Sequence, residues 1–284
     1  TVPESIDVFK AMVDGGCDII EVGVAYSDPV MDGPTIQRAA ETALTNGVRL
    51  RDIFTVIEQI SSVGGKAVVM TYWNPVLQYG VDKFARDLAS AGGLGLITPN
   101  LIPEEAGAWM EASEEHHLDR IFLVAPSSTE ERLAMTLDAS SGFIYAASTM
   151  GVTGARDAVS SMAPELTARI RAHSDIPVGV GLGVRSGAQA AEIAAYADAV
   201  IVGSALVSAV ENGLDIGRRV AARPRNGGDA GGAVAVDGDG GHLRAPAAEH
   251  AGDLADVAAL LAGLGDAAEN GIGHQIGRHG AAFA

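Results

Sequence analysis

The sequence has 284 residues, of which 48% are hydrophobic and 19% charged, a composition typical of a globular protein with a buried core. The 36 acidic residues against 19 Lys and Arg give a formal net charge of −17, which argues against nucleic acid or an anionic membrane as the main partner. A single cysteine, Cys17, excludes an intramolecular disulfide, and no Cys/His group has zinc-ligand spacing. We therefore expect no metal and a reducing, cytoplasmic setting. The most apolar window, residues 190–210, carries acidic residues and is broken by Gly203-Ser204, so no membrane span is predicted.

Seven short runs of apolar and β-branched residues predict parallel strands, because each is almost continuously apolar and the gaps between them hold helical patterns. The predicted strands are Asp18–Val24, Lys66–Tyr72, Gly93–Thr98, Arg120–Ala125, Phe143–Ser148, Pro177–Leu182 and Asp198–Gly203. The predicted helices are Ser5–Asp14, Pro34–Thr45, Leu50–Ser61, Val81–Ala91, Glu104–Glu115, Glu130–Ala139, Ala163–Ala172 and Ala188–Ala197. Ser5, Thr129 and Ser186-Gly187 mark helix starts, and glycine pairs mark several helix ends.

Alternating strands and helices build either a (β/α)8 barrel or a doubly wound sheet. A doubly wound sheet usually carries a phosphate fingerprint after its first strand, whereas the glycine-rich turns here follow the sixth and seventh runs. The sequence therefore predicts an α/β fold of the TIM-barrel type, a (β/α)8 barrel that lacks its first strand. We expect unpaired edges at Asp18–Val24 and Asp198–Gly203, and a chain that is marginally stable or prone to associate.

The composition of the chain changes near Arg218. Residues 1–217 are predicted to form the TIM-barrel catalytic domain, incomplete at its N-terminus. Residues 218–284 are rich in Gly and Ala, contain one aromatic residue, Phe283, and predict a low-complexity, disordered C-terminal tail. Within this tail only residues 253–264 have a pattern compatible with a short helix.

The segment Ile20–Gln37 carries the strongest candidate chemistry. Glu21 lies inside an apolar strand, where a carboxylate is costly unless it is paired or used. Asp28 and Asp32 follow on the loop after the carboxyl end of this strand, where barrel enzymes keep their catalytic groups. A partly buried carboxylate has a raised pKa and can act as acid and base near neutral pH. The alternative is a salt-bridged Glu21 and a plain turn at Asp28.

Two further segments suggest ligand binding. Gly179–Gly187 and Val202–Ala205 leave consecutive strands and open helices, a position where backbone amides bind phosphate in barrels. The alternative for both is a tight turn without a ligand. Ser148–Arg156 leaves the fifth run, and its glycines flank Thr153, which suits either a mobile lid or an exposed loop.

These motifs together resemble the tryptophan synthase alpha subunit family, over about residues 5–214. The most specific piece is the Glu-x-Gly-x-x-Tyr-Ser-Asp-Pro-x-x-Asp-Gly-Pro-x-Ile-Gln string that begins at Glu21. The other matching pieces follow in the family's order: Thr71–Pro75, Ser148–Gly154, Gly181–Gly183 and Gly203-Ser204.

The resemblance implies a retro-aldol cleavage of indole-3-glycerol phosphate to indole and glyceraldehyde 3-phosphate, with no metal or organic cofactor. It implies a pyridoxal-phosphate beta subunit as partner in an α2β2 complex, facing the loops around Asp28-Pro29 and Asn74-Pro75. It also implies Glu21 as the acid and base, and Asp32 as the carboxylate that binds the indole N–H. The expected substrate-binding residues are Tyr72, Asn100, Tyr145 and Thr153, with Gly154, Gly183, Gly203 and Ser204 holding the phosphate.

The chain departs from the family pattern at several positions. The first barrel strand is absent, Asn100 stands where the family usually has Asp, and Ala25 and Met31 replace a usual Pro and a usual small residue. These departures leave open a second hypothesis, a catalytically impaired alpha-like subunit that acts as allosteric partner of the beta subunit. Another phosphate-binding barrel lyase or isomerase is a third.

Overall fold

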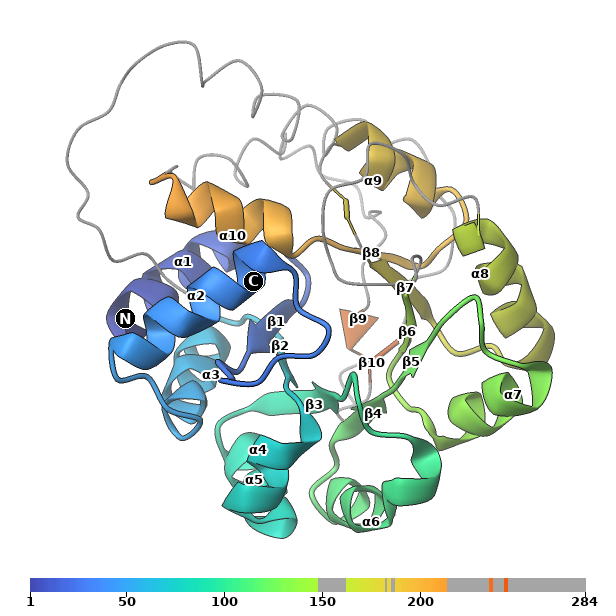
Figure 1. Cartoon of the computed structure of the whole chain (residues 1–284), viewed down its shortest axis with the longest axis horizontal. Coiled ribbons are helices and arrows are strands. Elements are labelled where there is room, and N and C mark those ends of the chain that lie inside the picture. The colour runs from blue at the N-terminus through green and yellow to red at the C-terminus, as the bar shows by residue number, and fades with distance from the viewer. Residues whose placement is uncertain (148–161, 182, 185–186, 214–234, 237–242, 245–284) are drawn as a thin grey trace.

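A computed structural model describes residues 1–147, 162–181, 183–184, 187–213, 235–236 and 243–244. Figure 1 looks into a ring of strands with the helices arranged around its outside. The strands are β1 (Ile20–Gly23), β2 (Ala67–Met70), β3 (Gly93–Ile97), β4 (Asp119–Ile121), β5 (Leu123–Val124), β6 (Ile144–Ala147), β7 (Val178–Gly181), β8 (Ala199–Ile201), β9 (Ala235–Val236) and β10 (Leu243–Arg244). The helices are α1 (Val2–Asp14), α2 (Pro34–Thr45), α3 (Asp52–Ser62), α4 (Trp73–Tyr79), α5 (Val81–Ser90), α6 (Gly107–Glu115), α7 (Glu130–Ala139), α8 (Met162–His173), α9 (Gly187–Ala194) and α10 (Ser204–Glu211), with a 3₁₀ turn η1 (Pro103–Glu105).

The strands of the ring pair in parallel in chain order, β1-β2-β3-β4 and β5-β6-β7-β8. The strands β4 and β5 are one predicted run, interrupted at Phe122, whose carbonyl still accepts from the Tyr145 amide at 3.0 Å. All seven predicted strands are therefore confirmed. Among the described residues no ladder joins β1 to β8, so the ring has a seam between these two strands.

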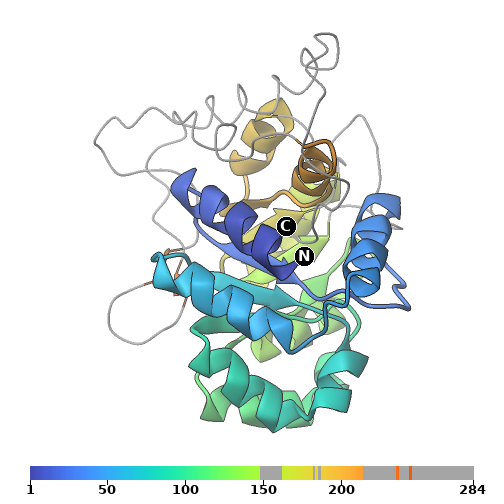
Figure 2. The ribbon, with the colours of Figure 1, turned by 90° about the vertical axis from the view of Figure 1, so that its left-hand side faces the viewer.

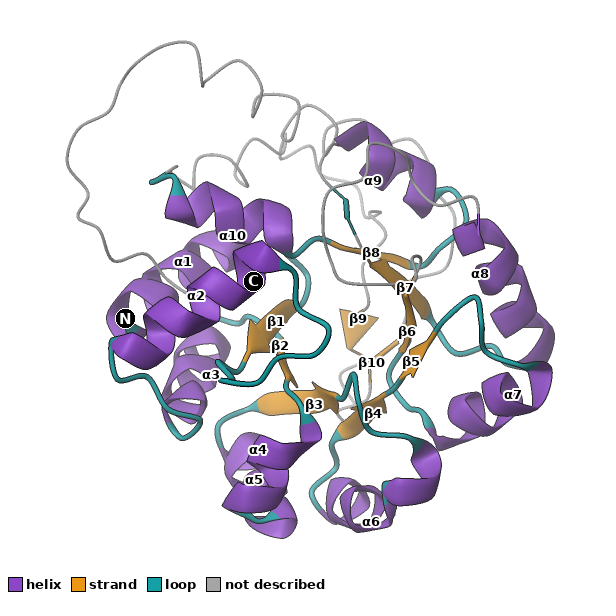
Figure 3. Ribbon diagram, viewed as in Figure 1, coloured by secondary structure: helices purple, strands orange, loops and turns teal. Residues whose placement is uncertain are grey.

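Apolar side chains form one core inside the ring and a second between the strands and the helices. The inner core consists of Val68, Ile97, Ile121, Phe143 and Tyr145, packed with Ile19, Met70, Leu94, Leu123, Ala199 and Ile201. The larger outer core is buried under the helices, where Phe9, Phe84 and Trp109 are fully buried. Figure 3 shows the helices arranged around the outside of the strands. The helices α1 and α3 pack against each other and lie side by side in Figure 2. This two-layer burial is what a barrel requires.

Local signals explain several helix ends. Pro34 occupies the first turn of α2, and the Thr129 hydroxyl accepts from the Arg132 amide at 3.2 Å to cap α7, so both helices begin where predicted. Gly16 and Gly64 follow α1 and α3 with φ of 93° and 81°, a left-handed conformation that few other residues adopt. These glycines stop the helices before the next strand.

Other boundaries differ from the sequence predictions. The α1 helix begins at Val2 rather than at Ser5, because Thr1 and Glu4 bond to each other across its first turn at 2.8 Å. The helix α4 was not predicted, and the predicted helix 104–115 divides into η1 and α6. In the tail, β9 and β10 pair as a short antiparallel ladder, and the predicted helix 253–264 lies outside the described residues.

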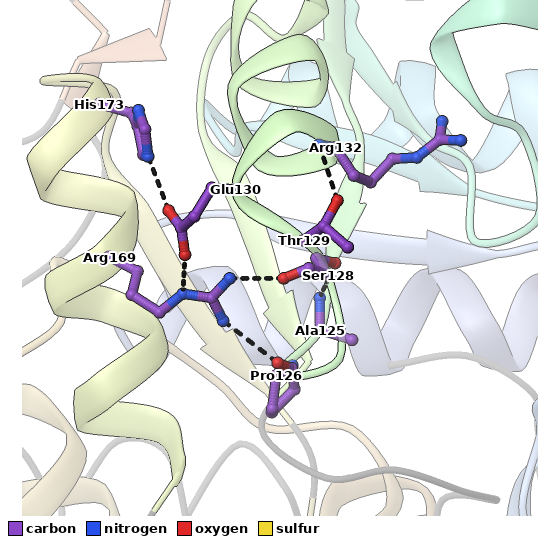
Figure 4. A network of polar contacts seen from close by, with 8 residues as sticks. All are labelled: Ala125, Pro126, Ser128, Thr129, Glu130, Arg132, Arg169 and His173. Atoms are coloured by element: carbon purple, nitrogen blue, oxygen red, sulfur yellow. Dashed lines mark hydrogen bonds and ion pairs between the residues drawn. The ribbon is translucent and has the colours of Figure 1, made fainter.

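A polar cluster fixes the turn between β5 and α7 (Figure 4). The guanidinium of Arg169, on α8, donates to the Pro126 carbonyl at 3.1 Å and to the Ser128 carbonyl, and its Nε donates to Glu130 at 2.6 Å. The imidazole of His173 lies 2.8 Å from the second oxygen of Glu130. This cluster ties the start of α7 to the neighbouring helix.

The helical layer also crosses the seam. The helix α10 packs against α2, and Figures 1 and 2 show the two close together. Arg38 on α2 and Glu211 on α10 form an ion pair of 3.3 Å. None of the described helices is both long and apolar enough to cross a bilayer.

Candidate active site

Glu21 lies on β1 with its side chain in the interior of the ring. The sheet register sets Glu21 opposite Val68, and its charge acts on the buried Tyr145 of β6. Among the described residues no hydrogen bond or ion pair to its carboxylate is found, so burial alone raises the pKa of Glu21 from its ordinary value to about 7. A carboxyl group with this pKa is present in both protonation states at neutral pH, as general acid–base catalysis requires.

Asp32 follows on the loop between β1 and α2, held by Tyr72. The Tyr72 hydroxyl accepts from the Val30 and Met31 amides at 3.2 and 2.9 Å and bonds to the Asp32 carboxylate. Burial raises the pKa of Asp32, and the bond from Tyr72 opposes that rise by stabilising the charged form. The structure thus gives Tyr72, predicted as a wall of the indole pocket, a second role in holding the Asp32 loop.

The loops after β1, β2 and β3 are linked by further polar contacts. The Asn100 side chain accepts from the Trp73 amide at 2.9 Å, the first amide of α4. The Asn74 amide group donates to the Tyr26 hydroxyl at 3.1 Å, and the Tyr26 ring lies 5.4 Å from the Tyr72 ring. Asn100 is exposed, and its bond to Trp73 caps α4. Sequence reasoning gave Tyr26 no role, since a contact across about 50 residues leaves no local pattern.

Tyr145, which the sequence predicts at the indole pocket, is buried on β6 and faces the interior of the ring. Burial raises its pKa, and the neighbouring Glu21 charge adds to that rise. Its hydroxyl packs against Gly181 of β7 so closely that a Cβ at Gly181 would lie 2.3 Å from it. The glycine at position 181 therefore makes room for the tyrosine, a role that the phosphate interpretation of this segment did not include.

Three of the four predicted phosphate residues, Gly183, Gly203 and Ser204, lie at the carboxyl ends of β7 and β8. Gly183 has a φ of 75° in the turn after β7. Gly203 is the N-cap residue of α10 and Ser204 its first residue, and no side chain among the described residues caps this helix. The first amides of a helix have no acceptors within the helix, so this end is suited to an anion. Thr153, predicted on the lid, and Gly154, predicted to help hold the phosphate, lie outside the described residues.

One group of side chains could hold a metal ion. Asp82 on α5 and Glu115 and His116 at the end of α6 place ligand atoms within 4.8 Å of one another. The sequence search for zinc spacing missed this group, because about 30 residues separate Asp82 from the other two. The group lies on the outer helices and forms an exposed ion pair between His116 and Asp82 at 3.2 Å.

A ring of parallel strands, a carboxyl group of raised pKa inside it and glycine turns at its carboxyl end are features of a (β/α)-barrel enzyme. A model of the tryptophan synthase alpha chain family matches residues 1–226. The alpha chain of Nocardia farcinica is 77% identical over 211 residues, which span 74% of this chain and 79% of that one. The Mycobacterium tuberculosis H37Rv alpha chain is 73% identical over 213 residues, 75% of this chain and 79% of that one.

A solved structure of Mycobacterium tuberculosis tryptophan synthase superimposes with a TM-score of 0.74 at 70% identity, covering 77% of this chain and 84% of that one. The chain therefore belongs to the tryptophan synthase alpha chain family. It is a lyase of tryptophan biosynthesis with the TIM-barrel fold of that family.

Proposed function

We propose that the chain cleaves indole-3-glycerol phosphate to indole and glyceraldehyde 3-phosphate, with Glu21 and Asp32 as catalytic residues. The observation that carries this proposal is the buried Glu21 carboxyl group with a pKa of about 7, on the strand that leads to Asp32. A carboxylic acid that shuttles protons and a second carboxylate that offsets positive charge are the two groups that a retro-aldol cleavage of this substrate needs.

In this mechanism the protonated Glu21 donates a proton to indole C3. The indole nitrogen then carries positive charge, which the Asp32 carboxylate stabilises by accepting a hydrogen bond from the indole N–H group. The ionised Glu21 next takes the proton of the glycerol hydroxyl on the carbon joined to C3. The carbon–carbon bond breaks, its electrons return to the indole ring, and the hydroxyl carbon becomes an aldehyde.

Backbone groups are proposed to hold the phosphate of the substrate. The turns at Gly183 and at Gly203-Ser204 lie at the carboxyl ends of adjacent strands, β7 and β8. Gly154 is proposed to contribute to the same phosphate site. Tyr145 is proposed to line the indole pocket beside Glu21, and Thr153 to reach Asp32 from a lid. We infer that residues 1–217 form the catalytic unit and that residues 218–284 form a separate tail.

We also infer a pyridoxal-phosphate beta subunit as partner in an α2β2 complex and a cytoplasmic site of action. The support is family membership, the solved tryptophan synthase structures and the single Cys17. Exposed Val30 and Leu77 lie beside the loops expected to face that partner. The proposed cleavage itself uses only groups of this chain and requires no metal or organic cofactor.

The alternative is a catalytically impaired subunit that only activates its partner. The replacement at Asn100 is the observation behind it. Purified protein incubated with indole-3-glycerol phosphate, with and without the beta subunit of a relative, distinguishes the two through indole release. Indole formed by the chain alone, and faster in the complex, supports the lyase. A chain that releases no indole in either arm, yet stimulates the beta reaction, supports the alternative.

A further inference from the structure

Asn100 makes a contact that leads to the proposed catalytic loop. Its side-chain oxygen accepts from the Trp73 amide at 2.9 Å, across the gap between the loops after β3 and β2. Tyr72 is the N-cap residue of α4, with extended φ of −65° and ψ of 154°, and its own side chain makes no cap hydrogen bond. Asn100 thus supplies from a neighbouring loop the acceptor that this helix start lacks locally.

The capped residue holds the Asp32 loop. The Tyr72 ring is buried, and its hydroxyl accepts from the Met31 amide at 2.9 Å and bonds to the Asp32 carboxylate. The helix α4 has only seven residues, so few hydrogen bonds of its own keep its first turn in place. A contact that fixes the start of α4 therefore also fixes the backbone that carries the Tyr72 side chain.

We propose that Asn100 is a positioning residue for Asp32, acting through the start of α4 and the Tyr72 hydroxyl. The proposal rests on the proposed function. In place of direct substrate binding, it gives Asn100 an indirect role, in which Asn100 does not touch the substrate. It explains how an amide can stand at this position, since the contact with Trp73 requires an acceptor oxygen and not a charge.

The first test uses hydrogen exchange, which is independent of activity. In Asn100→Ala the Val30 and Met31 amides should exchange about fivefold faster, the scale of one lost helix cap. Asn100→Asp keeps an acceptor at a helix N-terminus and should restore slow exchange. Thr129→Ala is the matched control, because it removes the cap of α7 (Figure 4) and should leave these two amides unchanged.

The second test uses kinetics with indole-3-glycerol phosphate. Asn100→Ala should lower kcat about fivefold with little change in KM, whereas Thr129→Ala should leave both unchanged. In a Tyr72→Phe background, Asn100→Ala should lower kcat by less than about twofold further, because the route through the hydroxyl is already broken.

Three results would overturn the proposal. Unchanged exchange of the Val30 and Met31 amides in Asn100→Ala refutes it whether or not the chain cleaves the substrate. A raised KM with unchanged kcat assigns Asn100 to substrate binding instead. Full additivity with Tyr72→Phe shows that Asn100 acts by another route. Absence of indole release by the wild-type chain refutes the proposed function, and the exchange experiment still decides whether Asn100 holds the loop.

Discussion

The two halves of the proposed site are built in different ways. In the acid–base half, at the ends of β1 to β3, the proposed functional groups are side chains. Directed hydrogen bonds hold the loops that carry these side chains, for example the bond from the Met31 amide to the Tyr72 hydroxyl. In the phosphate half, β7 and β8, the groups are backbone amides at glycine turns. The supporting strands differ as well: every residue of β7 is buried, whereas every residue of β8, at the seam, is only partly buried. The first half therefore depends on charge and the second on backbone geometry and strand support.

The largest effect in the series should come from replacing a carboxyl group of the acid–base half with an amide of the same shape. We expect Glu21→Gln and Asp32→Asn each to lower kcat by roughly 10²- to 10⁴-fold, the usual range for acid–base groups. Glu41→Gln, an exposed carboxyl group on α2, is the control for loss of one negative charge. Indole release under saturating substrate is the measurement. Near-normal turnover in either variant would remove that residue from the mechanism.

The same half should make folding stability depend on pH. Folding raises the pKa of Glu21 from 4.5 to about 7, so the native state binds this proton more tightly than the unfolded state. The contribution is fully present below pH 4.5 and is lost as the pH rises through about 7. At about 1.4 kcal/mol per pH unit, the free energy of unfolding should fall by about 3 kcal/mol over this interval.

Urea unfolding at pH 4.5, 6 and 8 measures this effect, with Glu21→Gln as the control, because the amide does not titrate. Subtracting the control removes the contributions of all other groups. Equal pH dependence in the two proteins would contradict the burial of Glu21 as the cause.

A strand added at the seam should stabilise β8, the strand that leads to the Gly203-Ser204 turn. A β-branched strand fused ahead of Thr1 can pair with β1 and β8 and cover the exposed parts of Val200 and Ile201, which are only partly buried. Covering them is worth about 2 kcal/mol, or about 4–8 °C in Tm. Thermal unfolding, compared with a Gly/Ser extension of equal length, tests this expectation. Equal Tm values would show that these edges are already covered.

A side chain in the phosphate turn should weaken ligand binding with the smallest effect of the series. Gly203→Asp adds bulk and a negative charge at the start of α10, and we expect glycerol 3-phosphate to bind about tenfold more weakly. Calorimetric titration measures this change. Gly107→Asp is the matched control, since a Cβ there meets no atom within 4 Å. Equal affinity in both variants would place the phosphate elsewhere.

Much of the fold follows from local patterns. The helices Pro34–Thr45 and Glu130–Ala139 have their predicted bounds because a first-turn proline and a threonine cap act within one turn. The helix α4 was not predicted, because the residue that caps it, Asn100, is 27 residues away in sequence. The break at Phe122 depends on pairing with strands on both sides and has no sequence signal of its own.

In the candidate site too, features set by the local sequence were predictable, and contacts between residues far apart in sequence were not. Strand alternation puts Glu21 on the same face as Ile19, and the structure shows Ile19 packed against the inner core. The contact between Tyr72 and Met31 joins residues 41 apart and obeys no periodicity. The close approach of Tyr145 to Gly181 depends on the register of neighbouring strands, which alternation alone does not fix.

The ion pair between Arg38 and Glu211 has a consequence for the behaviour of the molecule in different buffers. It joins the helices across the seam that no strand ladder bridges, and the Arg38 side chain is 58% exposed. Attraction between exposed charges is screened by dissolved ions over about 8 Å at physiological ionic strength and over shorter distances in concentrated salt. Hydrogen bonds between strands have no comparable sensitivity. Raising the ionic strength therefore weakens this contact between α2 and α10, while the hydrogen-bonded ladders of the two sheets stay intact.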